Sequence, residues 1–277
     1  MESVTRTLAG LVVAILASIV PLAGTYALLG GKAAVVAHLN ADHGPGSNVH
    51  LDVYQTREGS AAPIRRYDLD MTKDMHMIVL RDDFATFAHV HPACDAATGH
   101  FTIVVPMPRG HAYYIYTDSQ PTGIGQQVFR FTYDAGAGSV HAPVGLDEAS
   151  PTKAQVGRYS VRLAATTIPA TTPHTIDVTI ERDRKLATGL RPYLGAAAHA
   201  VFINTATLAY VHVHPMVQGA TMSMPMSGMQ MDDDGPAQAG PKLSMHVPAL
   251  PAGAYRLWLQ FQGPDGLQTV PFTLVAR

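Results

Sequence analysis

The sequence predicts an all-β protein in which two tandem β-sandwich domains follow an N-terminal transmembrane helix. Three observations predict this fold class. Gly and Pro are frequent, at 24 and 20 of 277 residues, and they separate short runs of β-branched and aromatic residues, which is typical of strands joined by turns. A histidine-containing segment near residue 76 returns near residue 199, and the first thirty residues contain a long uncharged apolar run.

The N-terminal apolar run, TLAGLVVAILASIVPLAGTYALL, covers Thr7 to Leu29. At about 1.5 Å per residue, a helix of this length would cross a hydrocarbon core of roughly 30 Å. We therefore expect residues 1–33 to form an anchor in the inner membrane. A cleaved signal peptide is the alternative, because AAVVA before His38 would fit a small-residue cleavage site. Both alternatives place the rest of the chain on the periplasmic or extracellular side.

The internal repeat is defined by three histidines and a proline. HMIVLRDDFATFAHVHP runs from His76 to Pro92, HAVFINTATLAYVHVHP runs from His199 to Pro215, and both have the form H-x12-H-x-H-P. The similarity continues downstream, where FTIVVPMPRGHAYYIY in the first copy corresponds to LSMHVPALPAGAYRLWL in the second. A shared spacing with matching flanks indicates two copies of one domain.

A segment rich in Gly, Ala, Ser and Pro, DAGAGSVHAPVGLDEASPTKAQVG, separates the copies. We expect a first domain at 34–134, a linker at 135–154 and a second domain at 155–277. Seven strand-like runs, with turn signals between them, favour an antiparallel sandwich of immunoglobulin-like type. In the second copy these runs are VRLAATT, HTIDVTIE, HAVFIN, LAYVHVH, KLSMHV, YRLWLQF and TVPFTLVA.

The histidine spacing predicts a patch of imidazoles in each copy. With a two-residue turn at Asp82-Asp83, His76 would lie directly opposite His89, with Cβ atoms about 4.5–5.5 Å apart, and His91 would lie diagonally on the same face. A turn at Thr205-Ala206 gives the second copy the same arrangement. Imidazole suits Zn, Cu, Ni and Fe, so we expect metal sites at the mouth of each sandwich. The expected ligands are His76, His89 and His91 in the first copy, and His199, His212 and His214 in the second.

A purely structural interpretation of these histidines competes with the metal sites. Apolar residues occupy both faces of the same strands, including Ile78, Leu80 and Phe87 beside the histidines of the first copy. The imidazoles would then be semi-buried groups that bond to the backbone and shape a loop corner.

A methionine-rich loop at 216–234 follows HVHP in the second copy, where the first copy has only ACDAATGH. Its segment MSMPMSGMQMDDD forms no apolar stripe, and loops of more than roughly 12–15 residues without structure are usually functional or disordered. Thioethers are soft ligands that select Cu(I). A low-complexity linker and a Met-rich surface for a protein partner are the alternatives. The expected copper ligands of the loop are Met222, Met224, Met226, Met229 and Met231; Cys94, His111 and His246 are further candidates whose role stays open.

The segments MHMIVLRDDFATFAHVHP and YLGAAAHAVFINTATLAYVHVHP resemble secreted or membrane-anchored bacterial proteins of the YtkA-like kind. More distantly they are similar to CopC-like copper-binding β-sandwiches. The first resemblance implies an extracytoplasmic immunoglobulin-like domain, and the second implies a small sandwich that carries copper with His and Met ligands. The chain departs from the CopC-like pattern in being duplicated and in having its Met tract inside a domain.

Charge and the motifs that the sequence lacks exclude several classes of function. Charged residues make up only 14% and the net charge is −2, so there is no basic surface for nucleic acid. The sequence has neither a Gly-rich phosphate loop nor a G-x-S-x-G nucleophile motif, and we expect no enzyme. We expect an extracytoplasmic protein that binds, buffers or delivers copper, with an envelope protein as a further partner. A metal-free interaction module of an envelope complex and a two-site copper redox enzyme are the alternatives.

Overall fold

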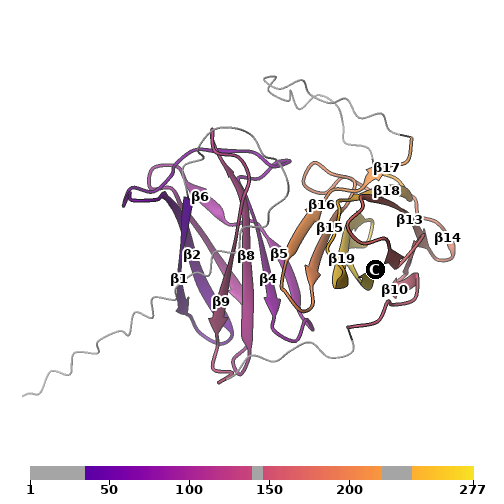
Figure 1. The fold of residues 1–277 in the computed structure, drawn as a ribbon, viewed down its shortest axis with the longest axis horizontal. Coiled ribbons are helices and arrows are strands. Elements are labelled where there is room, and N and C mark those ends of the chain that lie inside the picture. The colour runs from indigo at the N-terminus through magenta and orange to yellow at the C-terminus, as the bar shows by residue number, and fades with distance from the viewer. Residues whose placement is uncertain (1–34, 139–145, 220–238) are drawn as a thin grey trace, which may run out of the picture. The chain divides into compact units, whose positions relative to one another are not determined.

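The computed structural model describes residues 35–138, 146–219 and 239–277, and every regular element in these ranges is a β-strand (Figure 1). These residues form two compact units. The first comprises residues 35–68, 74–82 and 86–138, and the second comprises 69–73, 83–85, 146–219 and 239–277. Within the described ranges no helix has the length and apolarity needed to span a bilayer. The expected anchor at 1–33 lies outside them.

The first unit is a sandwich of two sheets. One sheet has the order β1-β2-β7-β6. In the other, β8 pairs with β3, β4 and β9, and β4 also pairs with β5. The strands are β1 (Val35–His43), β2 (Asn48–Arg57), β3 (Tyr67–Asp68), β4 (Met75–Arg81), β5 (Phe87–Val90), β6 (Ala93–Asp95), β7 (His100–Pro106), β8 (Ala112–Pro121) and β9 (Gln127–Asp134).

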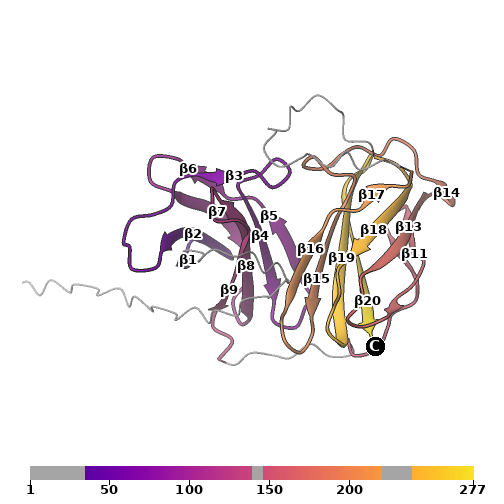
Figure 2. The same ribbon diagram turned by 45° about the horizontal axis from the view of Figure 1, so that its top comes forward.

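The second unit repeats this plan, and Figure 2 shows its two layers, with β15, β16 and β19 in one and β11, β13 and β18 in the other. The orders are β10-β11-β13-β18-β17, with β14 beside β13, and β12-β20-β19-β15-β16. The strands are β10 (Lys153–Val156), β11 (Tyr159–Leu163), β12 (Thr167–Ile168), β13 (His174–Arg182), β14 (Lys185–Leu186), β15 (His199–Asn204), β16 (Tyr210–Val213), β17 (Met216–Val217), β18 (Lys242–Val247), β19 (Gly253–Gly263) and β20 (Gly266–Ala276). The two-domain, all-β prediction is confirmed.

Each core follows from the period-two alternation of its strands. On β2, Val49, Leu51 and Val53 are fully buried, while the residues between them face outward. They pack in one cluster with side chains of the opposite sheet, including Met77 and Ile115. Burial of one such aliphatic side chain contributes about 1.5–3 kcal/mol. The second unit has an equivalent cluster in which β11, β13 and β18 meet β15, β19 and β20.

The β4–β5 hairpin differs from the expected register. His89 lies opposite Ile78 and not His76, because the loop after Arg81 is longer than two residues. The backbone N–H of Arg81 donates to the carbonyl of Thr86, so four residues form the connection. The hairpin of the second unit is shifted in the same way, with His212 opposite Val201. A shift of two residues keeps every side chain on its expected face.

Both units contain a tyrosine whose hydroxyl closes the turn before a long central strand. Tyr113 Oη donates to the Pro108 carbonyl and Tyr255 Oη donates to the Pro251 carbonyl, both at 2.9 Å. A tyrosine bonded to the backbone a few residues upstream is a recurrent feature of immunoglobulin-like sandwiches. This bond holds the corner from which β8 and β19 begin.

We predict that Tyr113→Phe and Tyr255→Phe each lower the free energy of unfolding by about 1 kcal/mol, because a partly buried hydrogen bond is lost while the ring stays in place. Urea denaturation of the full chain measures the effect. Tyr54→Phe is the control, since the Tyr54 hydroxyl makes no hydrogen bond within the part of the chain that the structure describes. Equal stabilities for all three variants would contradict a structural role for these bonds.

Candidate metal centres

The first unit gathers three imidazoles at one end of the β4–β5 hairpin. His76 Nδ1 lies 3.0 Å from His89 Nε2 and 3.1 Å from His91 Nε2. The rings of His89 and His91 have centroids 4.7 Å apart. His76 alternates with Met75 and Met77, which belong to the core, so the cluster lies on the face of the sheet that points away from this core, where His76 is 0% and His89 7% exposed. The histidines lie near the ends of β4 and β5 and not in the middle of the sheet.

One nitrogen cannot be well bonded to both neighbours at once. An imidazole nitrogen carries either one in-plane proton or one lone pair, so His76 Nδ1 makes one aligned hydrogen bond. Two Nε2 atoms nevertheless approach it at hydrogen-bond distance. Metal–nitrogen bonds of about 2.0–2.1 Å in a tetrahedral site correspond to nitrogen separations of about 3.3 Å. The two separations from His76 Nδ1 are therefore a few tenths of an ångström shorter than the spacing of nitrogens around one ion.

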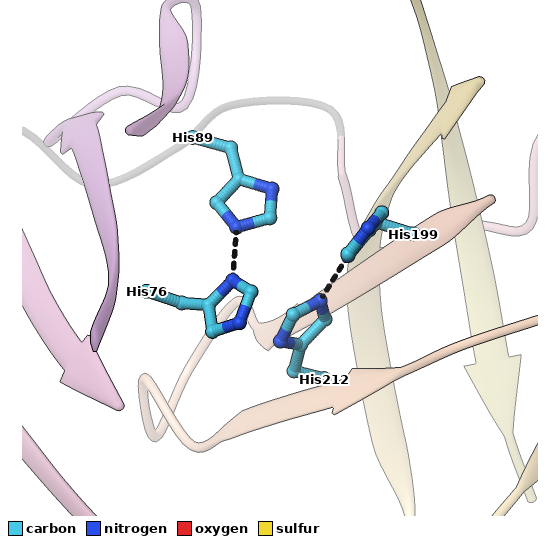
Figure 3. Close-up of side chains that lie close together, drawn as sticks. All are labelled: His76, His89, His199 and His212. Carbon is cyan, nitrogen blue, oxygen red and sulfur yellow. Dashed lines mark hydrogen bonds between the residues drawn. The ribbon is translucent and has the colours of Figure 1, made fainter. Parts of the chain in front are cut away.

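The second unit repeats the cluster with His199, His212 and His214. His199 Nδ1 lies 3.1 Å from His212 Nε2, and Figure 3 shows this pair together with the corresponding pair of the first unit, His76 and His89. The His214 ring centroid lies 4.7 Å from that of His199 and 4.5 Å from that of His212. In each unit, then, the two hydrogen-bonded histidines offer ring nitrogens close enough to share one ion.

The backbone fixes the tautomer of His199. Its Nε2 lies 2.9 Å from the carbonyl oxygen of Tyr193, which can only accept, so Nε2 carries the proton. In the neutral ring Nδ1 then presents a lone pair toward His212. Metal-binding histidines usually donate their second nitrogen to a carbonyl or carboxylate in this way. Sequence reasoning missed Tyr193, because a carbonyl acceptor leaves no signature in residue type.

The strand next to each cluster differs between the copies. Asp118 of β8 is directly opposite His76, whereas Gln260 of β19 is directly opposite His199. Asp118 is 1% exposed, and its carboxylate accepts hydrogen bonds of 2.8 and 3.0 Å from Gln126 Nε2. The strand beside the first cluster therefore carries a buried acid, whereas the strand beside the second carries a neutral amide. This difference was also missed, since it requires the β4–β8 and β15–β19 registers. The second cluster has an acid from another segment of its unit, since a carboxylate oxygen of Asp70 and ring nitrogens of His212 and His214 lie within 4.8 Å of one another.

The remaining candidate ligands are dispersed. His111 precedes β8, at the end of that strand opposite to Asp118, and His246 bonds through Nδ1 to Thr175 Oγ1 at 2.9 Å on the exposed face of β18. Met216 lies on β17, opposite Ser244. The five expected thioether ligands, Met222, Met224, Met226, Met229 and Met231, lie outside the described residues.

Cys94 is a half-buried thiol on β6. Burial raises the pKa of this thiol, and the negative charges of Asp74 and Asp95 raise it further. A raised pKa keeps the neutral thiol form and disfavours the thiolate, which is the form that binds metals and reacts with electrophiles. The environment of Cys94 is thus unfavourable for a ligand at neutral pH.

We predict that iodoacetamide alkylates Cys94 more slowly in the folded chain than in the urea-unfolded chain at pH 8, because the folded thiol has the higher pKa and is partly covered. Mass spectrometry of timed samples measures both rates. The rates should approach one another as the pH rises above the pKa of the folded thiol, apart from the effect of burial. A folded-state rate equal to or above the unfolded one at pH 8 would contradict this environment.

Comparison with solved structures gives only weak likenesses. A two-domain fibronectin type III segment of chicken tenascin is 10% identical, with a TM-score of 0.24, over 86% of this chain and 98% of that chain. MtrC from Shewanella baltica is 8% identical, with a TM-score of 0.26, over 87% and 68%. Likenesses of this extent assign neither a fold nor a function. No curated protein matches the sequence.

One family matches both copies of the repeat, at residues 31–137 and 154–277, and these two segments make up most of the chain. Residues 138–153 lie between the two matched segments. The chain belongs to the family described as a domain of unknown function, DUF8832.

Proposed function

We propose that this protein is an extracytoplasmic copper-binding protein that binds, buffers or delivers the metal. The observation that carries the proposal is the approach of two Nε2 atoms to His76 Nδ1 at 3.0 and 3.1 Å, with the same trio of rings in the second unit. Hydrogen bonding accounts for one of these approaches, and a shared cation accounts for both. The residues that would hold it are His76, His89 and His91, and His199, His212 and His214.

Copper is favoured over zinc by the sequence beside the second cluster. The Met-rich tract begins directly after His214 and supplies several thioethers, which are the soft ligands that select Cu(I). Thioethers need no deprotonation, and they suit an oxidising compartment better than thiolates do. The expected anchor at 1–33 would hold both units on the periplasmic or extracellular face of the membrane.

The two centres would differ in the groups that surround their histidines. Ionised Asp118 beside His76 would add negative charge, which favours a divalent ion such as Cu(II). In the second centre His199 faces the neutral Gln260, Asp70 offers a carboxylate near His212 and His214, and the adjoining thioethers favour the monovalent ion.

We predict that the full chain, purified in a neutral detergent, competes with a chromophoric chelator for Cu(I), and that His212→Ala/His214→Ala removes the stronger uptake. Loss of two direct ligands should lower the metal affinity by more than the roughly 10–100-fold reduction that is typical when a hydrogen-bond partner of a ligand is lost. His246→Ala is the matched control, because that exposed imidazole lies on another face of the same unit. Uptake of no metal ion by the wild type would leave the histidines as structural groups of an interaction module.

The methionines are tested separately. Replacing Met222, Met224, Met226, Met229 and Met231 together with Leu should weaken Cu(I) binding at least about tenfold and leave Cu(II) binding unchanged, because Leu keeps the apolar bulk but lacks the soft sulfur. Met71→Leu, at an exposed methionine outside the loop, serves as the control. Equal Cu(I) affinities of the fivefold variant and the control would exclude the loop from the site.

A further inference from the structure

A pocket rich in arginine lies in the first unit, and none of its lining residues belongs to a histidine cluster or to the Met-rich tract. It forms where β2 ends and the chain turns toward β3, and its volume is about 350 Å³. Its charged and polar lining includes Arg57, Ser60, Arg65, Arg66 and Thr122. Three guanidinium groups within ten residues are notable in a chain with only 19 Lys and Arg among its 277 residues.

The pocket wall is held by backbone bonds from several sides. The N–H of Ile64 donates to the Gln55 carbonyl at 2.8 Å, and the N–H of Thr122 donates to the Arg66 carbonyl at 3.1 Å. Gly99, at φ +81°, approaches so closely that a Cβ there would lie 2.4 Å from the Ile64 carbonyl oxygen. The arginines therefore project from a fixed loop, so less ordering entropy opposes ligand binding.

The arginines have no acidic partner within the described part of the chain. In the described ranges no carboxylate forms an ion pair with Arg57, Arg65 or Arg66. Two carboxylates lie close in sequence: Glu58 is exposed, and Asp68 accepts a 2.8 Å hydrogen bond from Thr122 Oγ1. The pocket thus keeps a net positive charge, and the planar guanidinium forks match the oxygens of a phosphate group.

The pocket also lies at the end of β2 that pairs with the beginning of β1. Arg57 is paired with Val35, the first residue of β1. The apolar run ends at Leu29, six residues before Val35. Six extended residues span at most about 20 Å. If residues 1–33 anchor the chain, this tether keeps the arginines close to the lipid headgroups.

We propose that this pocket binds the phosphate of an anionic phospholipid headgroup and so docks the first unit on the membrane surface. The inference rests on the membrane anchor of the proposed function but not on copper. Juxtamembrane arginines are attracted to anionic lipid within a Debye length of the surface. A pocket lined by three arginines adds a specific binding site for one phosphate group.

The test is calorimetric titration of the full chain in neutral detergent with dioctanoyl phosphatidylglycerol, with dioctanoyl phosphatidylcholine and with inorganic phosphate. We expect binding of the phosphatidylglycerol and at least about tenfold weaker binding by the R57Q/R65Q/R66Q variant. The control is R109Q, because Arg109 lies far from the pocket. Its loop is bonded through the Met107 N–H to the carbonyl of Ser47, in the turn at the opposite end of β1 and β2. Phosphatidylcholine, whose headgroup has no net charge, should bind at least about tenfold more weakly.

Three results would overturn the proposal. Equal binding of the two lipids would remove the requirement for net negative charge. Unchanged binding by the triple variant would place the lipid elsewhere. Inorganic phosphate that binds as tightly as phosphatidylglycerol would identify a site for free phosphate instead of lipid. Copper uptake by the triple variant should equal that of the wild type, so a failure of this inference is distinguishable from a failure of the copper proposal.

Discussion

The alternation of side chains along one hairpin is the constraint on which the candidate centres depend. Because neighbouring residues of a strand face opposite ways, β4 sends Met75, Met77 and Val79 into the core and leaves His76 on the other face. β5 brings His89 to that same face from across the ladder. The imidazoles can therefore meet without a cost to the core, and the centre and the fold are specified by different faces of the same strands.

The two copies show which parts of this arrangement tolerate change. The hairpin and its three histidines occur in both units. The side chains on the outer face of the β1-β2-β7-β6 sheet of the first unit are not repeated in the second. There His38 and His100 stack on either side of Tyr54, with centroid separations of 4.5 Å, and His100 bonds to Asp52 at 2.7 Å. At the corresponding positions of neighbouring strands, the second unit has Arg162, Thr179 and Lys242. The copies thus share the imidazole cluster while their surfaces have diverged, which favours a role for the cluster beyond supporting the sandwich.

The sequence predicted the strands, the repeat and the shared face of the histidines, since each follows from spacing. It predicted the wrong register, because the loop conformation depends on local bonds that spacing does not encode. Asn204 Oδ1 accepts from the N–H groups of Ala206 and Thr207, and Leu208 takes a φ of +60°, which together favour a four-residue connection. The Tyr193 carbonyl and the position of Asp118 depend on chain segments distant from the motif, so no local pattern could have indicated either.

The hydrogen bonds within each cluster bear on how a metal would enter and leave. With His199 Nε2 committed to the Tyr193 carbonyl, the proton between His199 Nδ1 and His212 Nε2 belongs to His212. An ion at the same position must displace that proton, and His212 can keep a neutral ring only by moving it to Nδ1. Proton and metal therefore compete for one point in space. A centre that is closed by a hydrogen bond when empty avoids unpaired lone pairs. This lowers the free-energy difference between the empty and loaded states, which would suit the proposed role in metal delivery.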